Sequence, residues 1–430
     1  MTRSRVGTPA PFPLVASFLV AGLACWLLAS VALLRAAPDL ARGWVATPAT
    51  LLAVHLLALG FLPLAVAGAA LHVLPTLLRS SGDPRRCWIG FAGLCAGPFL
   101  AVGIARHQPQ LTWTAAALVG LGLLSLLLEI GLLVARAPHD RMLLASRFGV
   151  AASGLHALLA FLLGSLLFVR EWRPWLGIPH ERLIAIHLHL AVFGWLTLLI
   201  VAVGRTLAPM LALAPSEPVR RRPIEEIVLT AGLWLAILGF ALDRKALLAA
   251  GTATIVAVLG RFVVVLVRAA HRSHMEAMEG PIAHFLAGVV FLAQAAALAV
   301  ALLLRSPSPR TLSAYVLLLL LGWAAGITLG HVGKLLALSA WTWWPPGPRP
   351  KQAAFYARRS WIAAAVAFAA GTELLAVGTL TGTTGTARAG GAFLVLSALA
   401  ALHGAAGTLA HPRPAPAPRP QALPDRTGPS

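Results

Sequence analysis

Twelve apolar segments, each long enough to cross a lipid bilayer as a helix, constrain this 430-residue chain more than any other feature. A transmembrane helix needs about 20 predominantly apolar residues. The segments lie at 12–35, 48–78, 87–105, 111–135, 146–169, 183–210, 226–242, 246–268, 281–304, 311–339, 360–382 and 390–411. None shows the period-two alternation of a membrane β-barrel. The predicted fold is therefore all-α: a polytopic membrane domain over residues 1–411 with about twelve transmembrane helices.

The composition excludes an ordinary soluble enzyme and a disordered protein. Hydrophobic residues make up 59% of the chain and charged residues only 11%, whereas a soluble domain has about 25% charged residues. The net charge of +20 comes from basic residues between the apolar segments, where they can face anionic lipid headgroups. We therefore expect the lipid bilayer, and no nucleic acid, as the partner. Residues 412–430 are proline-rich and are expected to form a disordered cytoplasmic tail.

The distribution of Lys and Arg predicts the orientation of the chain. The side of the N-terminus and the even-numbered loops has 22 of them, the opposite side has 11, and Arg261 lies within a span. Cytoplasmic loops carry an excess of basic residues. We therefore expect a multi-pass protein of the bacterial inner (plasma) membrane with both termini in the cytoplasm.

The sequence contains a predicted threefold internal repeat. The second span reads HLLALGFLPLAVAGAALHVLP and the sixth reads HLAVFGWLTLLIVAVGRTLAP, at a constant offset of 134 residues. The matched pairs are His55 with His189, Gly60 with Gly194, Phe61 with Trp195, and Pro75 with Pro209. The tenth span gives a weaker copy at an offset of 128, with Leu317 in place of the histidine. These copies lie four spans apart and run in the same direction, which predicts three parallel four-helix units over about 12–135, 146–268 and 281–411.

Eight of the 14 histidines fall within spans. An ionisable side chain inside the bilayer is costly and is a functional candidate by default, although a lone histidine there is more often a neutral imidazole bonded to a carbonyl. A rise of about 1.5 Å per residue places these histidines in layers. The outer layer has His55, His187 and His189; the inner layer has His72, His284 and His331; His156 and His403 lie between.

Two histidines on different helices at one depth can hold a haem iron from opposite faces of the macrocycle. His55 and His189 are matched by the repeat and are the best candidates for an outer centre. His187 is about 200° from His189 around its helix, so it serves another metal or a hydrogen bond. For an inner centre the candidates are His331 with His284 or His72.

Other features of the spans have competing interpretations. Gly322, Gly326 and Gly330 form a GxxxGxxxG stripe, which suits either a flat ligand or helix packing. Glu373 is either a proton relay or a hydrogen-bonded neutral acid. Arg261 and Lys334 either meet haem propionates or extend to the inner interface, the second being favoured.

Twelve spans in three parallel arcs, with the histidine motif of the second span and its Gly-aromatic step, resemble subunit I of the haem–copper oxidases. The second span is most similar to cbb3-type oxidases and bacterial nitric oxide reductases. The stretch Gly330-His331-Val332-Gly333-Lys334-Leu335 with Trp341 also looks like that of oxidase-subunit-I-like membrane proteins. The resemblance implies that His55 is a low-spin haem ligand. It also implies one or two haem b groups, with copper as a further candidate, and cytochrome c or quinol as electron donor beside other respiratory subunits.

The chain departs from that family at the copper site. It has no His-His pair, no histidine on the seventh span and no His-x-His on the tenth. His187-x-His189 is a conjectural substitute, so His55, His187, His189 and His331 are the metal candidates. We expect a membrane haem protein in respiratory electron transfer or in nitric oxide or oxygen binding or reduction. A non-catalytic respiratory subunit or assembly factor and a proton-coupled secondary transporter remain alternatives, and whether the chain is an oxidoreductase stays open.

Overall fold

The computed structural model describes residues 7–140, 143–168, 177–211, 222–272, 279–305, 308–345 and 347–411. These residues form helices and connecting turns, with no strand among them. Among the described residues, twelve helical segments are long and apolar enough to cross a membrane. We number them as spans 1 to 12 in chain order, and each overlaps the segment predicted for it. The all-α polytopic fold is confirmed, while the tail 412–430 lies outside the described residues.

Eight spans are single helices, and span 3 consists of two. The single helices are α1 (Phe12–Arg42), α6 (Pro109–Arg136), α7 (Leu144–Phe168), α10 (Ile224–Leu242), α11 (Lys245–His271), α12 (Gly280–Leu304), α15 (Arg358–Thr381) and α16 (Thr384–Leu409). In span 3, α4 (Pro84–Leu94) and α5 (Gly97–Ala105) meet just before Pro98, a residue that favours the first turn of a helix over its interior.

Spans 2, 6 and 10 share a different construction, because each changes from α-helix to π-helix and back. Span 2 contains α2 (Pro48–His55), the π-helical segment η1 (Leu56–Phe61) and α3 (Leu62–Leu77). Span 6 contains α8 (His180–His189), η4 (Leu190–Thr197) and α9 (Leu198–Leu211). Span 10 contains α13 (Pro309–Leu317), η5 (Leu318–Ala325) and α14 (Gly326–Thr342), and a short 3₁₀ helix, η6 (Gln352–Phe355), follows it.

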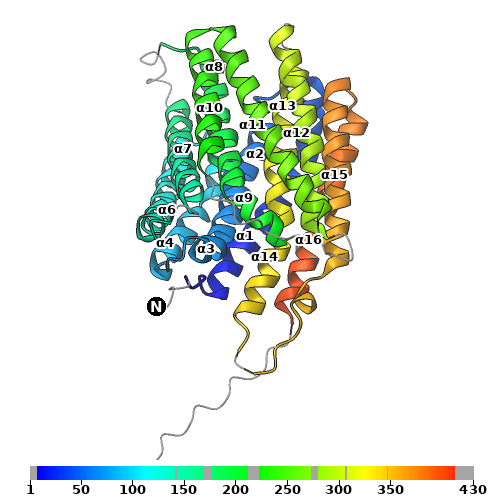
Figure 1. Cartoon of the computed structure of the whole chain (residues 1–430). Helices are drawn as coiled ribbons and strands as arrows, with labels where there is room; N and C mark the ends of the chain where they lie inside the picture. Colours follow the sequence, from blue (N-terminus) through cyan, green and yellow to red (C-terminus); the bar gives the residue numbers. More distant parts are fainter. Residues whose placement is uncertain are drawn as a thin grey trace, which may run out of the picture.

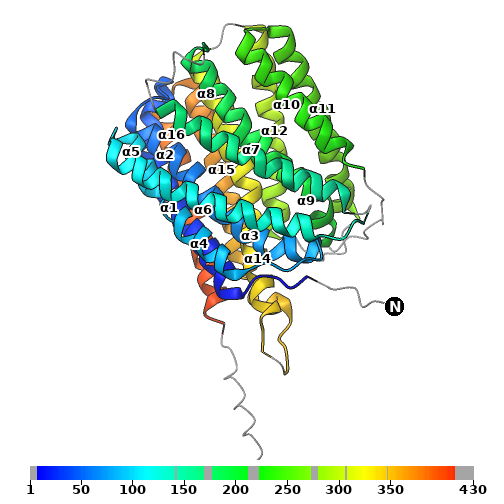
Figure 2. The same ribbon diagram turned by 90° about the vertical axis from the view of Figure 1, so that its left-hand side faces the viewer.

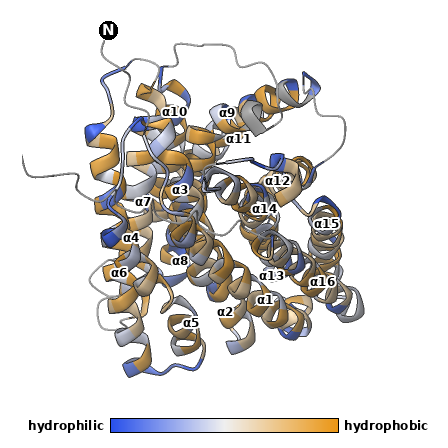
Figure 3. Cartoon of the chain, turned by 90° about the horizontal axis from the view of Figure 1, so that it is seen from below, coloured by the Kyte–Doolittle hydropathy of each residue, from blue (hydrophilic) through white to orange (hydrophobic). Residues whose placement is uncertain are grey.

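Consecutive spans pack side by side, and the arrangement closes where α16 packs along α1 (Figures 1 and 2). Spans 2, 6 and 10 meet in the interior, where α14 contacts α3 and η5 contacts η4. In the apolar 18-residue stretch that defines span 10, 83% of the residues are buried inside the protein, whereas the corresponding share in span 9 is 22%. Seen from below, the helices are hydrophobic around most of their circumference (Figure 3), as expected for helices that face lipid.

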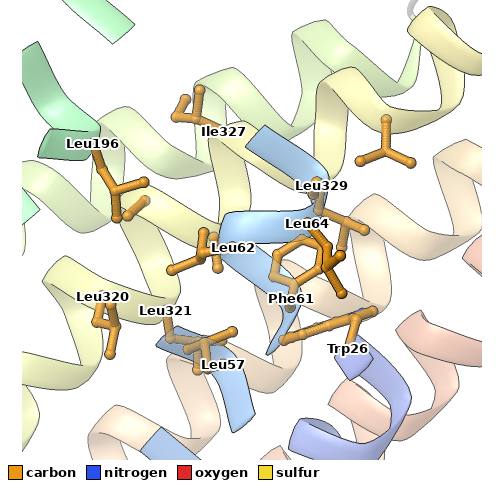
Figure 4. Close-up of a cluster of buried hydrophobic side chains, with 14 of the residues drawn as sticks. Trp26, Leu57, Phe61, Leu62, Leu64, Leu196, Leu320, Leu321, Ile327 and Leu329 are labelled. Carbon is orange, nitrogen blue, oxygen red and sulfur yellow. The ribbon is translucent and has the colours of Figure 1, made fainter. Parts of the chain in front are cut away.

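Leucine and aromatic side chains fill the space where the π-helical segments meet. Figure 4 shows Leu57 and Phe61 of span 2, Leu196 of span 6 and Leu321 of span 10 converging in one buried cluster. Trp26 of α1 closes one side of this cluster, with its ring 5.5 Å from that of Phe61. The interior at this level is therefore close-packed and apolar.

The π-helical segments begin at positions that the predicted repeat would match, and the repeat itself stays a prediction. They begin at residues 56, 190 and 318, which differ by 134 and then by 128, the same offsets that align the three sequences. π-helical turns are rare and occur often at functional sites. Their occurrence at matched positions in three spans indicates a shared local architecture.

On spans 2, 6 and 10, the positions that make close helix contacts are related by the same offsets of 134 and 128 residues. A Cβ atom added to Gly60, Gly194 or Gly322 would lie 3.0, 2.8 or 2.6 Å from the Cβ of Cys25, His156 or Phe291, respectively. These partners lie on spans 1, 5 and 9 and are separated by 131 and 135 residues. At a second level, a Cβ atom added to Gly68 or Gly330 would lie 2.9 or 2.6 Å from the Cβ of Phe18 or His284, respectively. The matching position of span 6 is Ala202, and there the glycine is on the partner helix, at Gly149. Two levels of packing thus repeat in register.

Candidate functional site

The outer histidines of spans 2 and 6 have the same local geometry. His55 is the last residue of α2, and its Nδ1 lies 2.8 Å from the carbonyl oxygen of Leu51. His189 is the last residue of α8, and its Nδ1 lies 2.7 Å from the carbonyl oxygen of Ala185. Because a carbonyl only accepts, each Nδ1 is the protonated nitrogen. Each Nε2 keeps its lone pair and has no hydrogen-bond partner among the described residues.

His187 is the histidine that approaches His55. Its Nδ1 donates to the carbonyl oxygen of Ala160 on α7, at 2.9 Å. Its ring rests on Gly164, where an added Cβ would come within 2.8 Å of Cε1. His187 also lies near enough to His55 for their charges to interact. The structure therefore places His187 on the side of spans 2 and 5.

His189 faces a different neighbour. Its ring lies 4.9 Å from that of Phe240 on α10 and 5.5 Å from that of Phe193, measured between centroids. No hydrogen bond or ring contact joins His189 to His55 in the described parts of the chain. The shared centre of His55 and His189 stays a prediction.

The structure brings two of the three inner histidines together. His284 on α12 is fully buried, and neither of its ring nitrogens has a hydrogen-bond partner. His331 on α14 lies near enough to interact with it electrostatically, and its Nδ1 donates to the carbonyl oxygen of Ile327 at 2.7 Å. His72 on α3 is also buried, with an unpartnered Nδ1.

His156 on α7 has a geometry that the sequence did not reveal. Its Nδ1 donates to the carbonyl oxygen of Ala152 at 2.7 Å, while its Nε2 is buried without a partner. The residue packs against Gly194 and the ring of Trp234. The only sequence signal was its place in a span, because its match to Cys25 emerges from the packing. Over the described residues, no group of three or more His, Cys, Asp or Glu side chains could hold a metal ion.

The basic residues considered for haem propionates have carboxylate partners within the chain. Lys334 Nζ lies 2.6 Å from an oxygen of Glu279, and Arg261 Nε lies 2.6 Å from an oxygen of Glu225. Between α12 and α15, Gln294 donates to Glu373 at 3.0 Å, and both residues are half-buried. This hydrogen bond is compatible with both interpretations of Glu373, as a proton relay and as a hydrogen-bonded neutral acid.

The glycine stripe of span 10 serves helix packing. Added Cβ atoms on Gly322, Gly326 and Gly330 would come within 2.9 Å of Phe291, Phe368 and His284, respectively. Side chains from spans 9 and 11 therefore occupy the space that a flat ligand would need.

Tyr356 lies beside the N-terminal end of α12, in the connection before α15. Its hydroxyl oxygen accepts a hydrogen bond from the backbone N–H of Gly280 at 3.1 Å, and Lys334 Nζ lies 5.2 Å from its ring centroid. Burial, reinforced by the nearby Glu279 carboxylate, raises the pKa of the Tyr356 phenol. The phenol therefore stays neutral at physiological pH.

No model of a known protein family matches the chain, and no curated protein matches it.

Proposed function

We propose that this chain is a membrane haem protein that transfers electrons in a respiratory chain or binds a diatomic gas, nitric oxide or oxygen. The observation that carries the proposal is the matched pair of His55 and His189. Each ends an α-helical segment, donates its Nδ1 proton to the preceding turn and leaves Nε2 free, directly before a π-helical segment.

The outer residues suit a haem iron in their donor chemistry. A metal-bound imidazole usually donates its other N–H to a carbonyl, which fixes both the tautomer and the ring orientation. His55, His187 and His189 all meet this condition. His55 and His187 are half-buried rather than enclosed, so their ring edges are not sealed by protein.

Each histidine of the proposed haem site has its own role. His55 would hold the haem iron together with a histidine of span 6. His189 is the repeat-matched candidate for the second ligand, and His187, whose Nδ1 is bonded to α7, is the other. When bound, haem would supply a redox-active iron and, where the iron stays accessible, a place for a gas molecule. The Nδ1 bonds to Leu51, Ala160 and Ala185 orient the imidazoles before any cofactor arrives.

Haem content is the direct test. We expect the detergent-purified protein to show low-spin bands in a reduced-minus-oxidised spectrum, with pyridine-haem quantification giving one or two haem b per chain. His55→Ala should abolish the bands of the outer centre, and His189→Ala or His187→Ala should identify the second ligand. His139→Ala, in an exposed loop, is the control and should retain the spectrum. A protein that stays colourless after haem-supplemented expression refutes the proposal and leaves the assembly-factor and transporter alternatives.

The proposal also includes the membrane topology of the protein and its electron donor. Both termini lie in the cytoplasm of a bacterium, and cytochrome c or a quinol supplies the electrons. The twofold excess of basic residues on the side of the N-terminus supports this orientation. Alkaline phosphatase fused after Leu409 should be inactive, because the enzyme folds only outside the cytoplasm; an active fusion reverses the assigned topology.

A further inference from the structure

His284 and His331 lie opposite each other on two antiparallel helices in contact. Along α12 and α14, Ile327 adjoins Gly288, Gly330 adjoins His284, and Lys334 pairs with Glu279. His331 follows Gly330 and lies one turn beyond Ile327, so it belongs to the face of α14 that α12 covers. The two rings therefore occupy the same level of one helix interface.

The pair is confined to one of the three predicted repeat units. The positions that match His284 are Phe18 and Gly149, and those that match His331 are Ala69 and Val203. Apolar or small residues satisfy the packing at those places. Helix packing alone therefore does not require two imidazoles between spans 9 and 10.

Burying His284 without a hydrogen-bond partner is also unfavourable in free energy. Neither of its ring nitrogens has a partner, and the residue is 0% exposed. Leaving a buried polar group unsatisfied is costly. A ligand that binds the lone pair would offset that cost for one of the two nitrogens. His331 is prepared for the same role, because its Nδ1 is tied to Ile327 and its Nε2 is free.

A haem does not fit between these two residues. A macrocycle held by two axial imidazoles separates their helices, whereas an added Cβ on Gly330 would lie only 2.6 Å from the His284 Cβ. A single metal ion needs no such separation. Imidazole nitrogen suits copper, zinc, iron and nickel.

The charge of the site selects among these ions. Glu279, the carboxylate just before α12, is paired with Lys334, and among the described residues no group of three or more His, Cys, Asp or Glu side chains includes the pair. Neutral imidazoles cannot balance the charge of an ion, and burying an ion grows more costly with its charge. A monovalent cuprous ion, which accepts two nitrogen ligands in a near-linear arrangement, meets these conditions best.

We propose that His284 and His331 bind one cuprous ion between spans 9 and 10. The ion exchanges from a donor ligand onto Nε2 of His331 and onto the unprotonated ring nitrogen of His284, so no proton is released and no electron moves. The site is independent of the outer haem centre, and neither proposal requires the other.

The test is a competition for cuprous copper under anaerobic conditions. The purified full-length protein is titrated with copper(I) held by the chromophore bicinchoninate. We expect it to withdraw one equivalent. His284→Phe and His331→Leu should each lose that equivalent while keeping the haem content of the wild type. His156→Phe, which removes a buried imidazole outside the pair, is the matched control and should keep the copper.

Two further measurements keep the outcome decisive. Size-exclusion elution shows whether each variant is folded, and X-ray absorption of the copper-loaded wild type needs no variant. The absorption spectrum should show two nitrogen neighbours and no sulfur. Failure of the wild type to withdraw copper, sulfur coordination by one of the three cysteines, or retention of copper in both histidine variants would overturn the proposal. Loss of haem in His284→Phe would instead make His284 a haem ligand.

Discussion

The hydrogen bond between Trp323 and Thr197 gives a quantitative test of how spans 6 and 10 are joined. Trp323 Nε1 donates to Thr197 Oγ1 at 3.0 Å, and both residues are 0% exposed. Thr197→Val keeps the side-chain shape but removes the acceptor, which leaves the indole N–H buried and unbonded.

Two measured ranges of free energy set the loss of stability expected for Thr197→Val. An unsatisfied buried donor costs about 1–3 kcal/mol, and hydrogen bonds between membrane helices have been worth about 0.6 kcal/mol on average and 1.7 kcal/mol at most. Because Trp323 Nε1 makes no other hydrogen bond among the described residues, we expect Thr197→Val to lower the free energy of unfolding by about 1–2 kcal/mol.

A double-mutant cycle isolates the bond. Trp323→Phe removes the donor together with some packing, and the double variant Thr197→Val/Trp323→Phe should lose less than the sum of the single variants. The assay is equilibrium unfolding by SDS in mixed detergent micelles. Thr342→Val, which removes an exposed hydroxyl bonded to Leu338, is the control and should change the stability by less than about 0.5 kcal/mol. A Thr197→Val variant as stable as the control, or strictly additive variants, would refute the reasoning.

Two further predictions concern packing and pH. Gly194→Ala should lower the stability by about 1–3 kcal/mol in the same assay, because the new Cβ would lie 2.8 Å from that of His156; Gly131→Ala, with open space around it, should have no such effect. The stability contributed by Tyr356 should be constant below pH ~10 and should fall at higher pH, because the unfolded phenol ionises near pH 10 while burial raises the pKa of the folded one. Tyr356→Phe should remove this part of the alkaline loss, and an unchanged profile between pH 9 and 11 would contradict it.

Hydropathy was sufficient to predict the twelve spans, because a bilayer-crossing helix must be apolar over most of its length. The boundaries were less predictable. The first helix continues to Arg42, beyond the expected end at 35, because Ala36 and Ala37 extend it and it tolerates Pro38. Span 3 divides near Cys95, just before Pro98, whereas the sequence predicted one continuous segment.

The π-helical segments were not predictable from local sequence. Leu56–Phe61 and Leu318–Ala325 have the same leucine-rich composition as the α-helices around them. Only the matched offsets of 134 and 128 residues linked these places in advance.

The histidine layers were partly predictable. Depth along a helix follows from residue number, so the sequence could group His284 with His331, and the structure places them on facing helices. The sequence did not predict how each helix is rotated about its axis, and this rotation decides which neighbours a histidine faces. The position of His187 beside His55 depends on how spans 5 and 6 pack, including the close approach at Gly164.

The haem content of the purified wild-type protein, measured as its pyridine haemochrome beside the His55→Ala variant, tests the central proposal most directly. We predict one or two haem b per chain in the wild type and the loss of the outer centre in the variant, with unchanged haem in His139→Ala. A wild-type protein without haem, or a His55→Ala variant with an unaltered spectrum and haem content, would contradict the assignment of the outer histidines.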